Sequence, residues 1–366
     1  MATSVRPKKV MLAMSGGVDS STAAILLKEA GYEVTGVTMA LWPKDTPPPP
    51  GETGCCSLSA VDDARRVAGI LDIPYYVLNY RELFELEVID YFVNSYLKGE
   101  TPNPCIVCND KIKFGSLLKK ARALGMDYIA TGHYARRLYD AERDRYLLAK
   151  GVDPSKDQSY ALYNFTQDQL AHTLLPLGEY TKKEIRKIAE ENGLPVAKKA
   201  DSQEICFITK GDYRDYLKNK AGDLIKPGPI LDINGNKLGE HQGLPFYTIG
   251  QRRGLGLALG KPYFVVALDP QRNAVIVGLK EDLYRKVLYA RNNNYIFWDK
   301  LPDKARVKAK IRYNAPEVPA VLYFLDEGRS RLEFDEPQSA ITPGQSVVYY
   351  QDDMVVGGGI IESAGD

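Results

Sequence analysis

A seven-residue stretch near the N-terminus carries the clearest chemical signal of the chain. It reads Ser-Gly-Gly-Val-Asp-Ser-Ser and covers residues 15–21, between an apolar, strand-like run at 10–14 and a helix-like run that begins at Thr22. Two glycines let a backbone approach an anion closely, and the start of a helix presents unpaired N–H groups. The stretch therefore predicts a phosphate cradle, although it has neither Walker nor Gly-x-Gly-x-x-Gly spacing. An ordinary strand–helix turn capped by Asp19 and Ser20 is the alternative.

Cysteines supply the second signal. Cys105 and Cys108 form a Cys-x-x-Cys pair after Thr-Pro-Asn-Pro, in which two prolines favour an extended loop. The pair precedes a helix expected over residues 111–124, whose first N–H groups would favour a thiolate. A lone Cys-x-x-Cys is a redox pair, half of a metal site or a coincidence. Cys206 follows the polar segment Asp-Ser-Gln-Glu, and a small buried core residue is its alternative interpretation.

Composition limits the class of protein. The chain has 366 residues, enough for two or three domains, and 44% of them are apolar, as in globular proteins. No apolar run approaches the ~20 residues of a membrane helix and no signal core follows the basic start, so we expect a cytoplasmic protein with no membrane partner. Five cysteines, an odd number, favour reactive thiols in a reducing compartment, and the adjacent Cys55 and Cys56 are interpreted as incidental.

Charge and histidine content narrow the class further. The formal net charge is +1, so any binding of nucleic acid must come from local basic patches. Only three histidines are present, and none has the spacing of a zinc site. We therefore expect no metal site built from histidines and no zinc hydrolase.

Strand-like and helix-like segments alternate over the first 135 residues. The expected strands are 10–14, 34–41, 75–78 and 128–131, and the expected helices are 62–71, 82–97 and 111–124. This order predicts an α/β fold with a doubly wound, Rossmann-like parallel sheet. Ligands of such sheets bind at the carboxyl ends of the strands, where residues 15–21 lie.

The expected secondary structure changes after residue 135. Residues 136–205 predict a strand pair and two helices, the second beginning with a Thr181–Glu184 capping box. Short strands are expected near the C-terminus at 307–313, 320–324, 345–350 and 354–361, which favours a small barrel. We expect three domains: a catalytic domain at 1–208, a small, mostly β central domain at 209–285 and a C-terminal β-barrel at 286–366.

Basic and apolar residues alternate without a break over residues 306–312. A period of two places Arg306, Lys308, Lys310 and Arg312 on one face of a strand. Neighbouring cations would be about 6.6 Å apart, a spacing commensurate with a phosphate backbone. The segment is therefore either a solvated barrel strand or an RNA-binding face, and Tyr313 beside it could stack on a base.

Several motifs together resemble those of the bacterial tRNA-specific 2-thiouridylases, in the PP-loop ATP pyrophosphatase superfamily. They lie at residues 15–21, 101–109, 131–136, 156–160, 201–208, 243–256, 314–316 and 343–350. The resemblance spans nearly the whole chain and implies a PP-loop catalytic domain, a small central domain and a β-barrel. It implies ATP-dependent 2-thiolation of the wobble uridine in the tRNAs for Lys, Glu and Gln. The C2 oxygen would be adenylated, and persulfide sulfur would displace AMP.

The resemblance also assigns site residues by position. Cys206 would carry the persulfide and Cys108 would be its partner nucleophile, forming a disulfide bond with it. ATP, with Mg²⁺, would bind at Ala13, Met14, Ser15, Gly16, Gly17, Val18, Asp19, Ser20, Met39 and Gly132. The target base would contact Asn103, Pro104 and Cys105. Further tRNA contacts would come from His133, Lys156, Asp157, Gln158, Arg312, Tyr313 and Gln345.

Several alternatives stay open. Some relatives carry an acidic residue at the position of Cys105, so a general acid or base role is not carried over to it. The thiols of Cys105, Cys108 and Cys206 could instead ligate an iron–sulfur cluster with one open iron position. Sulfur would come from a cysteine desulfurase, directly or through relay proteins, and could attack either as the persulfide or as released hydrosulfide.

Two other functions compete with thiolation. Another PP-loop adenylating enzyme, of the tRNA-lysidine or amide-forming type, would need no paired thiols. An RNA-binding module would use ATP only as a structural ligand.

Overall fold

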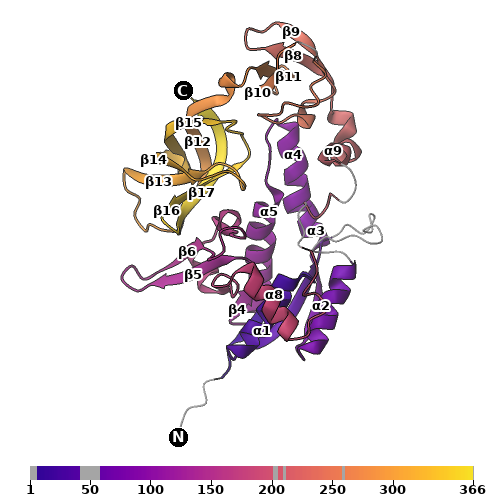
Figure 1. Cartoon of the computed structure of the whole chain (residues 1–366), viewed down its shortest axis with the longest axis vertical. Helices are drawn as coiled ribbons and strands as arrows, with labels where there is room; N and C mark the ends of the chain where they lie inside the picture. Colours follow the sequence, from indigo (N-terminus) through magenta and orange to yellow (C-terminus); the bar gives the residue numbers. More distant parts are fainter. Residues whose placement is uncertain (1–5, 42–57, 201–204, 209–211, 258–259, 366) are drawn as a thin grey trace. The chain divides into compact units, whose positions relative to one another are not determined.

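The computed structural model describes residues 6–41, 58–200, 205–208, 212–257 and 260–365 (Figure 1). The chain divides into two compact units. Unit 1 contains residues 1–88, 105–209 and 353–355, and unit 2 contains residues 89–104, 210–352 and 356–366. The residues that we assign to ATP and all three described cysteines lie in unit 1. Cys55, Cys56 and residues 201–204 lie outside the described residues.

A parallel sheet forms the centre of unit 1. Its strands are β1 (Lys9–Ala13), β2 (Glu33–Ala40), β3 (Tyr75–Asn79), β4 (Tyr128–Ala130) and β7 (Thr173–Leu174), in the order β3-β2-β1-β4-β7. Every neighbouring pair is parallel, which confirms the predicted sheet. Val10 and Leu12 of β1 are fully buried, because helices cover both faces of such a sheet. The strands predicted near 34, 75 and 128 are confirmed with small shifts of their ends.

The order of the strands reverses at β1. Strands β2 and β3 follow β1 in the chain and lie on one side of it. The chain then crosses over to β4, which pairs with β1 on the other side. This is the switch point at which open parallel sheets bind ligands. Helix α1 (Val18–Glu29) starts there, directly after β1.

Two further helices support this region. Helix α2 (Leu58–Ile70) packs near β2 and β3, and α8 (Lys182–Glu191) packs against α1. Helix α8 begins with the predicted capping box, in which the Thr181 hydroxyl accepts the Glu184 N–H at 3.3 Å and the Glu184 carboxylate accepts the Thr181 N–H at 2.7 Å. The predicted strand pair is also present, as the antiparallel hairpin of β5 (Ala135–Asp140) and β6 (Arg145–Lys150). The other predicted helix is α7 (Gln167–Ala171).

The helix that follows the Thr-Pro-Asn-Pro segment starts earlier than predicted. It runs through α5 (Pro104–Val107), a π-helical stretch η2 (Cys108–Leu117) and α6 (Leu118–Ala123), whereas the sequence predicted a helix from residue 111. The interpretation of Pro104 as part of an extended loop was wrong. Proline suits the first helical position, because its fixed φ is already helical and its missing N–H would have no partner there.

Helical structure also covers the segment predicted at 82–97. It consists of α3 (Arg81–Phe84), a π-helical turn η1 (Glu85–Ile89) and α4 (Asp90–Leu97). The first of these belongs to unit 1 and the last to unit 2. In unit 2, α4 packs against α9 (Tyr213–Ala221), with the Tyr96 and Tyr213 rings stacked at 4.9 Å.

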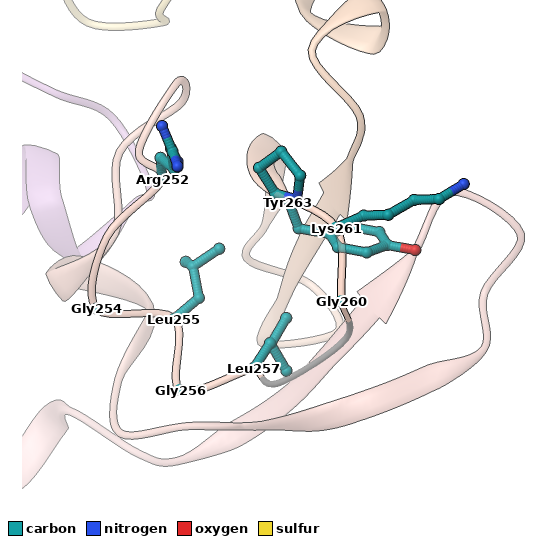
Figure 2. A pocket seen from close by; sticks show the side chains of 9 residues that line it. Arg252, Gly254, Leu255, Gly256, Leu257, Gly260, Lys261 and Tyr263 are labelled. Carbon is teal, nitrogen blue, oxygen red and sulfur yellow. The ribbon is translucent and has the colours of Figure 1, made fainter.

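Unit 2 contains a small sheet that matches the expected central region. Its strands are β8 (Gly228–Asp232), β9 (Lys237–His241), β10 (Phe264–Asp269) and β11 (Ala274–Gly278), in the order β10-β11-β8-β9. The loop before β10 lines a cavity of about 410 Å³, with Arg252, Leu255 and Lys261 among its side chains (Figure 2).

The C-terminal strands of unit 2 close into a barrel. They are β12 (Tyr284–Tyr295), β13 (Lys304–Lys310), β14 (Val318–Phe324), β15 (Ser330–Ser339), β16 (Ser346–Gln351) and β17 (Met354–Gly365). The order is β12-β15-β14-β13-β16-β17, and β12 also pairs with β17, which closes the ring. Leu288, Val307 and Leu332 belong to its buried core. The predicted barrel is therefore confirmed.

Strand β13 ends before the predicted segment does. The sequence predicted a strand over 307–313, but the strand stops at Lys310, so Arg312 does not share its basic face. Residues 311–316 form a turn with an Ala315 N–H to Arg312 C=O hydrogen bond of 3.1 Å. Lys304 takes the place of Arg312, because the strand begins earlier. Among the described residues, no helix is both long enough and apolar enough to cross a membrane.

Candidate active site

Residues 15–21, hereafter the phosphate loop, cover the tight turn that follows β1 and the first turn of α1. Gly16 has φ +67°, and a Cβ there would lie 2.2 Å from the Ala60 carbonyl oxygen, so only glycine fits. Gly17 caps α1, and its carbonyl accepts the Ser21 hydroxyl at 2.8 Å. The Ser15 N–H donates to the Ser20 hydroxyl at 3.1 Å. The loop is thus held by its own serines while the N-terminus of α1 stays directed at the switch point.

Gly132, which follows β4, approaches the phosphate loop very closely. A Cβ on Gly132 would lie 2.8 Å from the Ser20 nitrogen and 2.9 Å from the Asp19 carbonyl carbon. The structure therefore brings together two segments that the sequence assigned to ATP. Met14, the residue after β1, and Met39 of β2 are both buried, and Thr38 donates its hydroxyl to the Met14 carbonyl at 2.7 Å. A glycine cradle beside a helix N-terminus suits the phosphates of ATP.

Asp19 of the phosphate loop is engaged by two side chains that the sequence did not single out for the site. The ammonium of Lys182 lies 2.8 Å from each carboxylate oxygen of Asp19, and the Tyr134 hydroxyl donates to Oδ1 at 2.7 Å. The side chain of Lys182 is only 11% exposed. Its backbone N–H donates to Asp153, and this bond is the main reason that the pKa of Asp153 is lowered. Since 163 residues separate Lys182 from Asp19, no local pattern could have revealed the pair.

A second lysine fixes the phosphate loop from another side. Lys199 donates to the Gly16 carbonyl at 3.1 Å and pairs with Asp63 of α2 at 2.8 Å. Arg186 of α8 holds the segment that carries Lys199, by donating to the carbonyls of Ala197 and Lys199 at 2.7 and 3.1 Å. Lys199 was not among the site residues predicted from the sequence. The structure makes it a bridge between α2, α8 and the loop.

The cysteines lie on segments that share contacts with α3. Cys108 is 8% exposed and begins η2, which packs against α3. Cys206 is partly exposed in a turn closed by the Ile208 N–H to Ile205 C=O bond of 3.0 Å. Its neighbour Phe207 packs edge-on against Phe84 of α3, with ring centroids 5.9 Å apart. The segments that carry Cys108 and Cys206, the two cysteines assigned to sulfur transfer, therefore both contact the short helix α3.

The structure changes the argument for an activated Cys108. The sequence placed Cys108 just ahead of a helix, but it lies one turn inside the helix that starts at Pro104. The first turn, at the positive end of the helix dipole, instead carries Cys105, which is exposed.

The iron–sulfur interpretation does not fit the positions of the thiols. Cys105, Cys108 and Cys206 do not gather as ligands: across the described ranges, no group of three His, Cys, Asp or Glu side chains could hold a metal ion. We therefore derive no step through such a cluster.

The predicted tRNA residues of unit 1 adjoin the phosphate loop through Tyr134. Gln158 accepts the Tyr134 N–H at 3.0 Å, and Asp157 accepts the Gly151 N–H at 3.1 Å. Both side chains therefore hold the loop that follows β6 in place. His133 lies 2.7 Å from the Thr131 hydroxyl through Nδ1. Burial, together with the cation of Lys113, holds the pKa of His133 well below its usual range. His133 is therefore a neutral hydrogen-bonding group rather than a cation for phosphate.

In unit 2, Gln345 lies beside the segment assigned to the target base. Its side-chain amide donates to the Thr101 carbonyl at 2.8 Å, and the Thr101 N–H donates to the Pro343 carbonyl at 2.8 Å. Asn103 and Pro104, which belong to that segment, lie two and three residues after Thr101. The contact places Gln345 next to the stretch of chain that leads into Asn103 and Pro104, which the sequence assigned to the target base.

The remaining predicted tRNA residues lie on the surface. Arg312 and Tyr313 are exposed in the turn after β13, and the Lys310 ammonium lies 5.7 Å from the Tyr313 ring centroid. Lys156 is partly exposed in the loop after β6. None of these positions conflicts with contact to RNA.

Known domain families match the chain in three consecutive parts. The tRNA methyl transferase HUP domain matches residues 8–210 and the tRNA methyl transferase PRC-barrel domain matches residues 214–279. The Aminomethyltransferase beta-barrel domain matches residues 285–361. These matches and the observed sheets confirm the predicted fold: a Rossmann-like domain with a parallel sheet, a small central domain and a C-terminal β-barrel.

Among solved structures, the U34-tRNA thiolase NcsA from Methanococcus maripaludis, which holds a 4Fe-4S cluster, is 16% identical. The match covers 60% of this chain and 67% of that chain, with a TM-score of 0.34. A likeness this weak does not carry the cluster over to this chain.

Curated relatives match over almost the full length. The tRNA-specific 2-thiouridylase MnmA of Moorella thermoacetica is 77% identical over 353 residues, covering 96% of this chain and 99% of the relative. The tRNA-specific 2-thiouridylase MnmA of Carboxydothermus hydrogenoformans is 56% identical over 356 residues, covering 97% and 98%. With a glycine phosphate cradle and two cysteines in one unit, and with relatives this similar, the chain belongs to the tRNA-specific 2-thiouridylase family.

Proposed function

We propose that this chain uses ATP to activate the C2 oxygen of the wobble uridine in tRNA and delivers sulfur to C2 from Cys206. As a member of its family, the chain is a tRNA sulfurtransferase that 2-thiolates uridine. The observation that best supports this mechanism is that the phosphate loop, Cys108 and Cys206 belong to the same compact unit. Activation and sulfur transfer can then act on one base.

The phosphate loop supplies the first half of the chemistry. Residues 13–20, Met39 and Gly132 would hold ATP, with the N–H groups at the start of α1 facing its phosphates. Bound ATP, with Mg²⁺, supplies an AMP group that turns the C2 oxygen into a leaving group. The N–H groups and the helix dipole then stabilise the charge that develops on the departing pyrophosphate.

The cysteines supply the second half. A persulfide on Cys206 attacks C2 with its terminal sulfur, and the C2–O bond breaks to release AMP. The Cys108 thiolate then attacks Sγ of Cys206, which leaves the terminal sulfur on the base and forms a Cys108–Cys206 disulfide. This step is a thiol–disulfide exchange and needs an accessible thiolate. Alternatively, Cys108 attacks the persulfide first and releases hydrosulfide, which attacks C2.

Sulfur has to be supplied from outside the chain. A cysteine desulfurase would transfer sulfur to Cys206, directly or through relay proteins, and a thiol reductant would reopen the disulfide after each turnover. The partial exposure of Cys206 in its turn is compatible with such a donor. The tRNA itself would contact the residues assigned to it from both units.

The sharpest test separates the two halves of the reaction. With Cys108→Ser and Cys206→Ser, we expect pyrophosphate release that depends on tRNA to persist, because adenylation of the C2 oxygen needs neither thiol, while 2-thiouridine disappears from the anticodon nucleosides. Mass spectrometry of those nucleosides, after incubation with ATP and a persulfide donor, measures the product. Cys55→Ser removes a thiol that we assign no role and serves as the control. Full thiolation by both serine variants would overturn the roles of Cys108 and Cys206.

A further inference from the structure

The strongest unexplained feature of unit 1 is the lysine beneath the phosphate loop. Lys182 contacts both oxygens of Asp19 at 2.8 Å, while the Tyr134 hydroxyl binds one of them at 2.7 Å. The Lys182 ammonium also lies 5.8 Å from the centroid of the Tyr134 ring. Asp19 thus accepts hydrogen bonds from Lys182 and Tyr134, and the Lys182 ammonium balances the charge of the carboxylate.

The position of Lys182 is unfavourable on local grounds. It is the first residue of α8, directly after the Thr181 cap, where the helix dipole favours acidic rather than basic residues. Its side chain is 11% exposed, whereas Lys187 of the same helix is 73% exposed. A buried cation at a helix N-terminus costs stability unless a partner compensates for it. Asp19 is that partner, so the placement favours a function at the phosphate loop over helix stability.

Asp19 poses a problem for the binding of a polyanion. Its carboxylate projects from the second residue of α1, so it lies at the helix end that would hold the phosphates of ATP. An unbalanced negative charge at that end would oppose ATP, because like charges repel strongly where solvent is partly excluded. The side chain of Asp19 is 30% exposed, so water screens its charge only in part.

We propose that Lys182 is a positioning residue for ATP: its ammonium neutralises and orients the Asp19 carboxylate, so that the phosphate loop accepts a polyanion. The inference rests on the proposed function, because it assigns the loop to ATP. Lys182 acts through Asp19 in this account and does not itself contact the phosphates. Tyr134 fixes the carboxylate from the other side and so restricts its rotation.

The test measures ATP affinity by titration calorimetry, without tRNA, and so is independent of thiolation. For Lys182→Met we expect ATP binding to weaken about tenfold or more, equivalent to roughly 1.4 kcal/mol. Lys182→Arg keeps the charge and should restore most of the affinity. Lys187→Met, on the same helix but exposed, is the matched control and should bind ATP like the wild type.

A double variant decides whether Lys182 works through Asp19. In an Asp19→Asn background the carboxylate charge is gone, so adding Lys182→Met should change ATP affinity by less than about threefold. This comparison stands even where Lys182→Met alone fails to fold. A tenfold further loss in that background, or wild-type affinity in Lys182→Met alone, would overturn the inference. If ATP binds as expected but tRNA triggers no pyrophosphate release, the proposed function fails instead.

Discussion

At the scale of single residues, the site depends on backbone positions that only glycine can occupy. Gly132 approaches the backbone of Asp19 and Ser20 so closely that an added Cβ would lie 2.8 Å from the Ser20 nitrogen. Side-chain ends can rotate away from such an overlap, but a backbone nitrogen inside a helix start cannot. The contact therefore fixes the phosphate loop relative to the end of β4.

Gly132→Ala tests this close approach. We expect the phosphate loop to shift, ATP affinity to fall at least tenfold, and the free energy of unfolding to drop by roughly 1–3 kcal/mol from overpacking. Calorimetry with ATP and urea denaturation measure the two effects. Gly69→Ala is the control: a Cβ there meets nothing within 4 Å in α2, so it should raise stability by about 0.5–1 kcal/mol. Unchanged ATP binding by Gly132→Ala would show that the loop tolerates the methyl group.

At the scale of elements, α8 supports the phosphate loop although it lies far from it in sequence. It presents Lys182 to Asp19 at its first residue, and its Arg186 holds the segment of Lys199 that bonds to Gly16. The start of this helix is fixed by the Thr181–Glu184 capping box. The first turn of α8 therefore carries the capping box and also positions the buried side chain of Lys182.

Thr181→Ala should lower the free energy of unfolding by an amount that depends on pH. The Thr181 N–H and then its hydroxyl hold the pKa of Glu184 below its ordinary value of 4.5. A lowered native pKa stabilises the fold above pH 4.5 and loses that contribution as pH falls through the native pKa. The variant should lose about 1 kcal/mol at pH 7 through the missing N-cap hydroxyl. Alanine keeps the N–H donor but removes the hydroxyl donor, so Glu184 loses part of its lowered pKa and the gap to wild type should narrow toward about pH 3. Urea denaturation at both pH values measures it. Thr181→Ser should behave like wild type, and a gap that widens in acid would contradict the account.

The sequence could predict those features whose residues are neighbours in the chain. The capping box was predictable because its partners are three residues apart, and β1 was predictable because its apolar run is continuous. The start of α5 was not, because proline suits both an extended loop and a first helical turn. The Lys182–Asp19 pair depends on the folded sheet to bring the two residues together, so no spacing encodes it. The domain boundaries at 208 and 285 stay predictions.

At the scale of the whole molecule, charge has to be organised locally, because the net charge is only +1. The barrel offers one such place on the outer face of β13, where Lys304, Arg306 and Lys308 are exposed while Val307 and Ala309 are buried. Arg306 pairs with Asp335, and this bond lowers the pKa of Asp335 and keeps part of the positive charge neutralised. The two lysines therefore carry most of the charge that this face can offer to RNA.

Lys304→Gln with Lys308→Gln tests whether this face binds the tRNA backbone. Each phosphate contact releases counterions, so losing two contacts should reduce the slope of log affinity against log salt by about 1.4–1.8. Binding of tRNA, measured by filter retention across a salt series, gives that slope. Arg306→Gln should reduce it less, because Asp335 already neutralises the guanidinium. Lys237→Gln on β9 removes the same charge from a lysine that is bound to Glu240 and should leave the slope unchanged. An unchanged slope in the double variant would make the alternation along β13 a feature of a solvated barrel strand, and the RNA contacts of the barrel would then have to come from Arg312, Tyr313 and Gln345.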